Sequence, residues 1–169
     1  MSQIAYVCFG SNLGDRRAKF EEALDALAQL PCTIMKGASS LYETVAVGLS
    51  DGGGPFINAV ICLDTDLSPG DLSRELRRIE SALGKPATHR SDISRVIDLD
   101  LLLYGNQRIY EDGLEIPHPR MHSRAFVLLP LAEVAGDVVH PVLMKTVKTM
   151  AEMLPRSDVQ GVRRAGDSR

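Results

Sequence analysis

Two acidic residues, Asp98 and Asp100, stand one residue apart inside the apolar run 96–104. Alternate side chains of a β-strand share a face, so these carboxylates are expected about 6.5–7 Å apart at the backbone. Like charges this close repel each other, and a divalent cation between them removes that cost. Mg²⁺ prefers carboxylate oxygens, so the pair predicts a magnesium site.

Basic residues flank the acidic strand on both sides in the sequence. They are Lys85, His89, Arg90 and Arg95 before it, and His118, Arg120, His122 and Arg124 after it. Acidic residues between basic ones predict magnesium carrying a polyphosphate. The alternative is that Asp98 and Asp100 form the solvated face of an amphipathic strand. A solvated face usually mixes Thr, Lys, Ser and Glu, whereas Leu102 continues this face, so the pattern favours a site.

The composition indicates one domain with a real core. The chain has 169 residues, of which 44% are hydrophobic, and a formal net charge of -3. That length suffices for a single domain and leaves no room for a second catalytic one. Because binders of nucleic acids and membrane surfaces generally need an excess of basic residues, the acidic balance argues against both partners.

Cysteine usage and the N-terminal residues predict a cytoplasmic protein. The chain has an odd number of cysteines, namely Cys8, Cys32 and Cys62, and none shows Cys-x-x-Cys spacing. We therefore expect reduced thiols. The N-terminus enters strand-like sequence without a basic segment and a long apolar stretch, and no run of about 18 apolar residues follows. We therefore expect neither export nor a membrane span.

Apolar periodicity predicts the order strand, helix, strand, strand, helix, strand. The strands are expected at residues 4–9, 33–47, 56–64 and 96–104, and the helices at 16–30 and 69–83. The second and third strands follow each other with no helix between them. This order predicts a ferredoxin-like α+β fold, with an antiparallel sheet and helices on one face, rather than an alternating parallel fold.

Further elements are expected around this core. The turn Gly105-Asn106 and a short strand at 107–110 predict a hairpin with the acidic strand. Helices are expected at 124–135, where Pro130 starts or kinks a turn, and at 142–154.

The remaining segments have no apolar period. Residues 85–95 are expected to form a mobile loop, and residues 155–169 a polar, flexible tail. Residues 1–154 then form the single domain. We expect a monomer, because the apolar faces are satisfied within one chain.

Five segments resemble those of the 6-hydroxymethyl-7,8-dihydropterin pyrophosphokinase family, and they occur in the family's order and spacing over roughly residues 3–154. The segments are Gly-Ser-Asn-Leu-Gly at 10–14, Ser-Ser-Leu-Tyr-Glu-Thr at 39–44, Phe-Ile-Asn-Ala at 56–59, Arg-Val-Ile-Asp-Leu-Asp-Leu-Leu at 95–102, and Ile-Pro-His-Pro-Arg-Met at 116–121 continuing to 124–128. The resemblance implies that one pyrophosphokinase domain at 1–154 moves pyrophosphate from ATP onto a pterin alcohol in folate biosynthesis. It also implies two Mg²⁺ ions and the release of AMP.

The resemblance implies roles on the nucleotide side for residues that match the family. Asp98 and Asp100 fall on its magnesium-binding pair, in agreement with the strand pattern. The residues on ATP-binding positions are Glu80, Arg95, Leu101, Leu114, His118 and Arg124, of which Leu101 and Leu114 match the adenine pocket and Arg95, His118 and Arg124 the phosphate contacts. The aspartates and the two arginines are the expected catalytic residues.

On the pterin side, Thr44, Phe56, Asn58 and Phe126 fall on positions that bind the heterocycle. An amide offers a donor and an acceptor to the pterin edge, and aromatic rings can sandwich its flat system. Plainer interpretations exist for several site residues. The two phenylalanines could be core, Asn58 could satisfy backbone groups, His118 could be a turn residue, and Arg95 and Arg124 could be surface charges. We interpret residues 10–14 as structural.

The chain departs from the family pattern before Arg95. It contains no tryptophan, and Asp92 stands where the family has an aromatic residue in a loop that closes over the substrates. Val45 replaces a usual proline. Two alternatives to the pyrophosphokinase hypothesis therefore stay open. One is a degenerate member that binds a pterin or a nucleotide without turnover, and the other is a different magnesium-dependent phosphotransferase or hydrolase.

Overall fold

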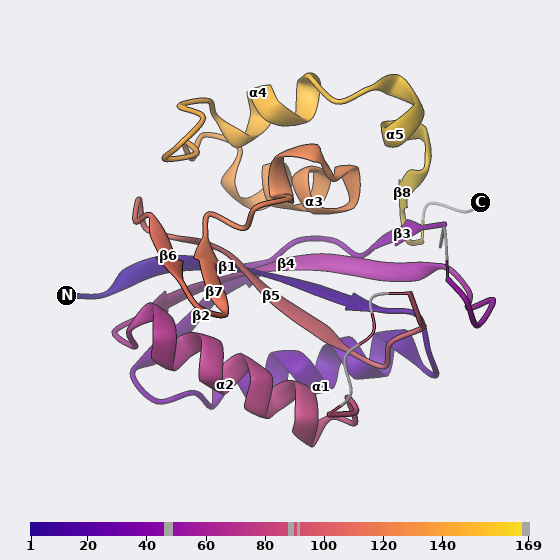
Figure 1. The fold of residues 1–169 in the computed structure, drawn as a ribbon, viewed down its shortest axis with the longest axis horizontal. Coiled ribbons are helices and arrows are strands. Elements are labelled where there is room, and N and C mark those ends of the chain that lie inside the picture. The colour runs from indigo at the N-terminus through magenta and orange to yellow at the C-terminus, as the bar shows by residue number, and fades with distance from the viewer. Residues whose placement is uncertain (46–48, 88–89, 91, 167–169) are drawn as a thin grey trace.

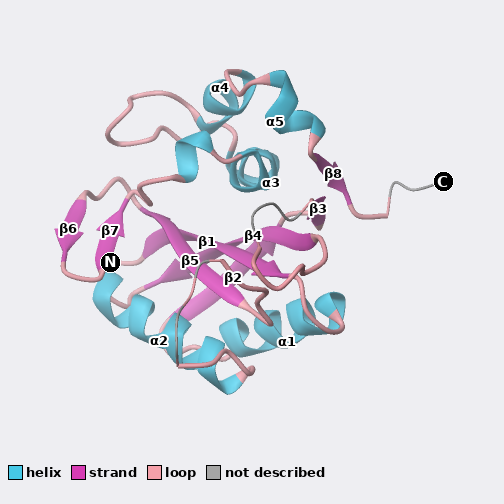
Figure 2. Ribbon diagram, turned by 45° about the vertical axis from the view of Figure 1, so that its right-hand side comes forward, coloured by secondary structure: helices cyan, strands magenta, loops and turns pink. Residues whose placement is uncertain are grey.

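A central sheet separates two pairs of helices in the computed structural model, which describes residues 1–45, 49–87, 90 and 92–166 (Figure 1). The elements are β1 (Gln3–Ser11), α1 (Arg16–Ala28), β2 (Thr33–Ala38), β3 (Tyr42–Thr44), β4 (Phe56–Thr65), α2 (Pro69–Ala82), β5 (Asp98–Tyr104), β6 (Ile109–Glu111), β7 (Leu114–Ile116), the 3-10 helix η1 (Met121–Ser123), α3 (Ala125–Ala135), α4 (Val147–Glu152), α5 (Arg156–Gln160) and β8 (Val162–Arg164). Helices α1 and α2 cover one face of the sheet, and α3 and α4 cover the other (Figures 1 and 2).

The sheet has the strand order β5-β1-β4-β3-β8, and β2 also pairs with β4. Every pairing in it is antiparallel. This arrangement confirms the ferredoxin-like α+β prediction. It also makes β5, which carries the two aspartates, an edge strand.

Helices α1 and α2 begin at capping residues that the sequence contains. The Asp15 carboxylate accepts a hydrogen bond from the Ala18 N–H at 3.0 Å, and the Ser68 hydroxyl accepts one from the Asp71 N–H at 3.1 Å. Pro69 occupies the first helical position of α2, where its missing N–H costs nothing. Each helix buries one face, with Phe20, Ala23 and Leu27 buried in α1, and Leu72, Leu76, Ile79 and Glu80 buried in α2.

Two apolar clusters lie on opposite faces of the sheet. Val7 and Phe9 of β1 belong to the cluster under α1 and α2. Tyr6 and Cys8 belong to the cluster under α3 and α4, as does Leu128. The alternation of β1 therefore buries both of its faces, and the C-terminal helices complete a second layer beyond the one expected from the core pattern.

The hairpin predicted between the acidic strand and residues 107–110 is wrong. β5 pairs with β1, whereas β6 pairs with β7, with Glu111 opposite Leu114. The two residues between them are Asp112 and Gly113, and Gly113 has φ 78°, the left-handed conformation that tight hairpin turns require. The Asp-Gly pair was the stronger hairpin signal in this region.

The strand predicted at 33–47 divides into β2 and β3, which both pair with β4. Between β2 and β3, Ser39 is hydrogen-bonded to β4. Its N–H donates to the Val60 carbonyl at 2.8 Å, and its hydroxyl accepts from the Val60 N–H at 2.9 Å. Residues 46 and 47 of that prediction lie outside the described residues. The helix predicted at 142–154 is shorter, since α4 begins only after the Thr146 cap.

The C-terminal residues differ from the flexible tail that the sequence predicts. Residues 156–160 form α5, and β8 pairs with β3, with Val162 opposite Thr44. These two segments lie far apart in the sequence, so no local periodicity reveals the pairing. Residues 167–169 lie outside the described part of the chain.

The segment predicted as a mobile loop is described only at residues 85–87, 90 and 92–95, which form no helix or strand there. Among the helices of the described residues, none has the length and apolar character that crossing a membrane requires.

Replacing Leu27 by alanine tests the core under α1. Leu27 is fully buried, so Leu27→Ala is expected to lower the free energy of unfolding by about 2–5 kcal/mol through lost burial and a cavity. Urea denaturation measures the loss. The matched control Leu143→Ala removes a leucine that is 41% exposed and is expected to change stability by no more than about 0.5 kcal/mol. Equal losses for the two variants would contradict the assigned core.

Candidate active site

Two cavities of about 680 Å³ each meet at the edge strand β5. The α3-side cavity, lined from α3 and the sheet, includes Thr44, Phe56, Asn58, Arg95, Arg124 and Phe126. The α2-side cavity, lined from α2 and the β6–β7 hairpin, includes Glu80, Lys85, Leu101 and Leu114. Asp98, Asp100 and His118 line both cavities. All twelve residues that the sequence singled out therefore line one cavity or both.

The sheet register brings the acidic and amide side chains into adjacent rows. Asp98 lies opposite Gly10 of β1, and Gly10 lies opposite Asn58 of β4. A Cβ atom on Gly10 would stand 3.2 Å from the Asn58 Oδ1, so the glycine leaves room for that amide. Asp100 lies opposite Cys8, one row further along the sheet.

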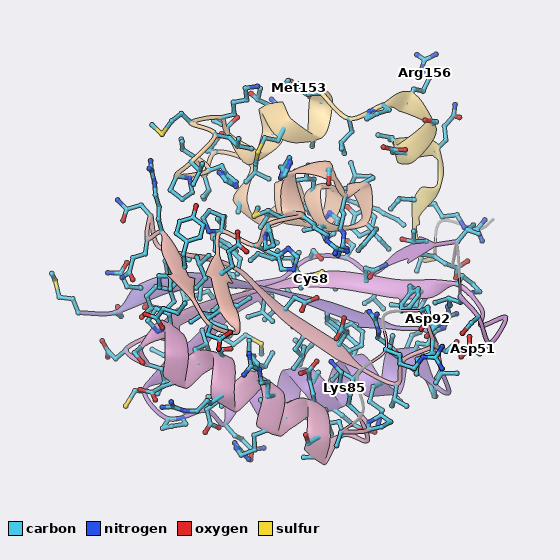
Figure 3. The ribbon with its side chains drawn as sticks, in the orientation of Figure 1. Cys8, Asp51, Lys85, Asp92, Met153 and Arg156 are labelled. Carbon is cyan, nitrogen blue, oxygen red and sulfur yellow. The ribbon has the colours of Figure 1, made fainter. Side chains whose placement is uncertain are left out.

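A lysine joins the two acids on the α2 side. Lys85 Nζ donates to Glu80 Oε2 and to Asp98 Oδ1, each at 2.7 Å. Glu80 also accepts the Leu99 N–H at 2.9 Å, and Arg95 donates to the second Asp98 oxygen at 3.1 Å. Figure 3 shows Lys85 below the sheet, on the side of α1 and α2. The sequence placed Lys85 among the basic flanking residues but gave no sign of this bridge.

The two strand aspartates differ in their electrostatic environment. Burial alone would raise the pKa of Asp98, but the Lys85 hydrogen bond and the charges of Lys85 and Arg95 outweigh it and hold that pKa below its usual range. Burial, followed by repulsion from Asp98 and Glu80, raises the pKa of Asp100 to about 7. Asp100 is therefore the carboxyl whose negative charge is least compensated by these neighbours.

Burial acts in opposite directions on the pKa values of Glu80 and Lys85, although both pKa values end above their usual range. Burial raises the pKa of Glu80, and the hydrogen bonds from Lys85 and Leu99 only partly oppose it. Burial would lower the pKa of Lys85, but its hydrogen bonds to Asp98 and Glu80 prevail and raise it. Lys85 thus remains an ammonium group between two acids.

His118 and Arg124 bring nitrogen groups to the α3-side cavity, and His118 lines the α2-side cavity as well. The His118 Nδ1 accepts the Arg120 N–H at 3.1 Å, so the neutral imidazole carries its hydrogen on Nε2. Burial and the nearby charges of Arg124 and Arg120 lower the pKa of His118. The Arg124 guanidinium lies 5.5 Å from the centre of the Phe126 ring, a cation–π distance.

The far end of the α3-side cavity combines aromatic rings with an amide. Asn58 is buried and donates to the Thr44 hydroxyl at 3.1 Å, so its side chain bonds to another side chain. Within the described residues, neither apolar cluster includes Phe56, while Phe126 packs at the border of the cluster under α3. A flat, partly polar ring system matches this combination of surfaces.

Asn12 ties the loop before β5 to the end of β1. Its backbone N–H donates to the Arg95 carbonyl at 3.0 Å, and its Oδ1 accepts the Arg95 N–H at 2.6 Å. Its Nδ2 donates to the Ser94 hydroxyl and to the Gly54 carbonyl, at 3.0 and 3.1 Å. The segment 10–14 is therefore structural in a specific sense, because it positions the backbone of Arg95.

The loop that contains Asp92, where the chain departs from the family pattern, is hydrogen-bonded to the loop that contains Asp51. Asp51 accepts the Ser94 N–H at 2.8 Å and the Ser94 hydroxyl at 3.0 Å. The Asp92 carbonyl accepts the Ser50 N–H at 2.7 Å, while the Asp92 carboxylate pairs with Arg90. Figure 3 shows Asp51 and Asp92 at the same end of the sheet. The two loops thus meet beside Arg95 without an aromatic residue at position 92.

The acid pair suits a magnesium ion that keeps non-protein ligands, rather than a metal site closed entirely by protein side chains. In the part of the chain that the structure describes, no group of three or more His, Cys, Asp or Glu side chains could hold a metal ion. Magnesium at phosphate-transfer sites is usually held by one or two carboxylates, with waters and phosphate oxygens as its other ligands. Asp98 and Asp100 supply two carboxylates, and the weakly compensated charge of Asp100 favours a cation there.

The fold and the site define an α+β protein with two small-molecule cavities that share a pair of acids. The family model for 7,8-dihydro-6-hydroxymethylpterin-pyrophosphokinase (HPPK) matches residues 6–136. A 2-amino-4-hydroxy-6-hydroxymethyldihydropteridine pyrophosphokinase from Haemophilus influenzae is 40% identical over 151 residues, which cover 88% of this chain and 93% of that protein. The one from Pseudomonas aeruginosa is 38% identical over 164 residues, covering 97% and 98%. The chain belongs to the HPPK family of enzymes.

Solved structures confirm the fold. An HPPK-DHPS chain in complex with substrates superposes with a TM-score of 0.76 and 14% identity, covering 96% of this chain and 46% of that one. A Plasmodium falciparum HPPK-DHPS chain also gives 0.76 at 14% identity, covering 97% and 49%. The present chain therefore spans about half the length of these solved chains.

Replacing Lys85 by methionine tests the bridge between the acids. Because the buried Glu80 carboxylate and the largely buried Asp98 carboxylate would lose their ammonium partner, Lys85→Met is expected to lower the free energy of unfolding by about 1–3 kcal/mol at pH 7 in the presence of EDTA. Urea denaturation measures it. Lys36→Met, on an exposed strand position, is the matched control and should change stability by no more than about 0.5 kcal/mol. A Lys85→Met loss as small as the control's would rule out the bridge.

Proposed function

We propose that this protein transfers pyrophosphate from ATP to the hydroxymethyl group of 6-hydroxymethyl-7,8-dihydropterin and releases AMP, in folate biosynthesis. The observation that carries this proposal is the meeting of two cavities at Asp98, Asp100 and His118. A reaction that joins two substrates needs their reacting atoms at one place, and this junction provides it. Membership of the HPPK family supports the same reaction.

The nucleotide belongs in the α2-side cavity. Leu101 and Leu114 offer apolar surface to the adenine ring, and Glu80 lines the same cavity. The triphosphate then extends toward the junction, where Arg95, His118 and Arg124 offset its negative charge. In this interpretation Arg95 and Arg124 are not surface charges, in keeping with their partial burial.

The pterin alcohol belongs in the α3-side cavity. Phe56 and Phe126 supply ring surfaces for the heterocycle, and Asn58 and Thr44 supply hydrogen-bonding groups for its polar edge. Its hydroxymethyl arm then reaches the junction with the nucleotide cavity.

Asp98 and Asp100 are the residues that would hold two Mg²⁺ ions. When bound, the ions would neutralise the negative charge that develops on the phosphate groups during transfer. The strand geometry keeps both carboxylates on one face, directed at the junction.

The chemical step is an in-line displacement. The pterin hydroxymethyl oxygen forms a bond to the β-phosphorus of ATP, and the bond from that phosphorus to the oxygen that bridges it to the α-phosphorus breaks, so AMP leaves. The hydroxyl proton is lost to solvent. Arg95, His118 and Arg124 stabilise the charge that moves onto the leaving oxygen, so positioning and electrostatics supply most of the rate and no dedicated general base is assigned.

We further propose that the protein works as a monomer.

Replacing either strand aspartate by asparagine tests the acid pair. Asp98→Asn and Asp100→Asn are each expected to lower AMP formation at least about 10³-fold while the fold is retained, because the metal-bridging charge is lost. AMP is measured chromatographically with ATP, magnesium and the pterin alcohol, and circular dichroism checks the fold. Asp25→Asn, on the surface of α1, is the control and should keep wild-type turnover. Near-normal AMP release by either strand variant would contradict the assignment.

The same assay separates the alternatives. AMP formed without any pterin would favour another phosphotransferase or hydrolase, and binding of both substrates without AMP would identify a degenerate member.

Replacing Phe56 by alanine tests the acceptor site. Stacking of a flat heterocycle on an aromatic ring contributes about 1–3 kcal/mol, so Phe56→Ala should raise the KM for the pterin alcohol by about 10- to 100-fold. The KM for ATP should stay within about twofold. Steady-state kinetics with each substrate varied in turn measures both. Tyr110→Ala removes an exposed ring of β6 and is the control. A parallel rise in both KM values would assign Phe56 to the fold instead.

A further inference from the structure

The residues after α4 form a segment, here called the C-terminal strap, that consists of α5 and β8 (156–164). The strap crosses from the outer layer of helices back to the sheet and ends beside β3 (Figures 1 and 2). It lies beyond residues 6–136, the part of the chain that the family model matches. None of the roles assigned above involves it.

The strap is anchored at several points. β8 pairs with β3, and the N–H of Ala165 donates to the Leu41 carbonyl at 2.8 Å. Arg163 pairs with Glu43 at 2.9 Å on one side of β8. On the other side, Arg164 reaches Glu133 of α3 at 3.4 Å, so the strap is joined to the sheet and to a helix.

Glu133 collects the contacts that hold this corner. Its carboxylate accepts hydrogen bonds from the Tyr42 hydroxyl at 2.7 Å and from the Ser40 hydroxyl and N–H at 2.8 and 2.9 Å. Tyr42 is the first residue of β3 and Ser40 lies just before the strand, which ends at Thr44. Strap, β3 and α3 therefore meet at one polar cluster.

The strap also forms part of the wall of the α3-side cavity. The strap residues that line the cavity are Ser157, Asp158, Gly161 and Val162. Alternation along β8 puts Val162 on the same face as Arg164, which points toward α3, so the Val162 side chain is directed to the cavity side. Val162 is also the residue opposite Thr44, which pairs with Phe56 on its other side.

We infer that the C-terminal strap is a specificity wall of the acceptor site, in which Val162 packs on the pterin alcohol and β8 holds Thr44 in position. This inference rests on the proposed function, because it assigns the acceptor to the α3-side cavity. None of the strap residues lines the α2-side cavity, to which we assign the nucleotide. The strap therefore acts on the acceptor and leaves ATP binding unchanged.

Two substitutions on opposite faces of β8 test the inference. Val162→Phe adds volume to the cavity wall and should raise the KM for the pterin alcohol about 10-fold or more, with the KM for ATP within about twofold. Arg163→Ala changes the neighbouring residue, whose side chain pairs with Glu43 outside the cavity lining, and should leave both KM values within about twofold. Melting temperatures of both variants are measured alongside.

A second variant covers a folding failure of the first. Arg164→Met removes the ion pair with Glu133 and loosens the strap without entering the cavity lining. It should raise the KM for the pterin alcohol about threefold or more and leave the KM for ATP unchanged. Calorimetric titration of the same variants with the pterin alcohol should show the same change in Kd.

The outcomes distinguish the inference from the proposed function. If wild-type protein neither binds nor converts the pterin alcohol, the proposed function fails and the inference falls with it. If wild type is active but Val162→Phe and Arg164→Met both keep a wild-type KM for the acceptor, the strap inference alone is overturned. Equal changes in both KM values, or an equal effect of Arg163→Ala, would also overturn it by assigning the strap a purely structural role.

Discussion

Charge balance at the edge strand β5 is the constraint on which the site depends. Asp98, Asp100 and Glu80 bring three acidic groups into a region that is otherwise apolar core. Lys85 and Arg95 compensate Asp98 directly, at 2.7 and 3.1 Å. Burial, followed by repulsion from Asp98 and Glu80, raises the pKa of Asp100 to about 7, so its negative charge is less compensated than that of Asp98.

The position of β5 explains why one strand can serve two cavities. In the sheet that the structure describes, β5 pairs with β1 on one side only. Side chains of alternate residues point to opposite layers, so Asp98 and Asp100 face α3 while Leu99 and Leu101 pack under α2. At an edge, the carboxylates are also reachable around the strand, and the two cavities can join there. A central strand, covered on both sides, would have kept the two layers separate.

Local sequence pattern correctly predicted the features that depend on residues close together in the sequence. The caps at Asp15 and Ser68 and the apolar spacing behind them predicted α1 and α2, and alternation predicted the shared face of Asp98 and Asp100. The errors at β5 and β8 fall where pairing is non-local, whereas the missed β6–β7 hairpin had a local Asp-Gly signal. The hairpin was assigned to Gly105-Asn106 although β5 pairs with β1, and β8 went unrecognised because its partner β3 is 120 residues away, as the contact between Glu43 and Arg163 records.

The same distinction applies within the site. The spacing of Asp98 and Asp100 predicted a metal site and the flanking basic residues a polyphosphate, whereas resemblance to the HPPK family supplied the other positions. All twelve predicted residues line the cavities. Residues that hold other residues in place leave no such trace, because many of their partners are backbone groups on distant segments. Asn12 acts on the Arg95 backbone from 83 positions away, and β8 acts on Thr44 through a strand ladder. A sequence therefore reveals the chemistry of a site more readily than the scaffold that makes this chemistry precise.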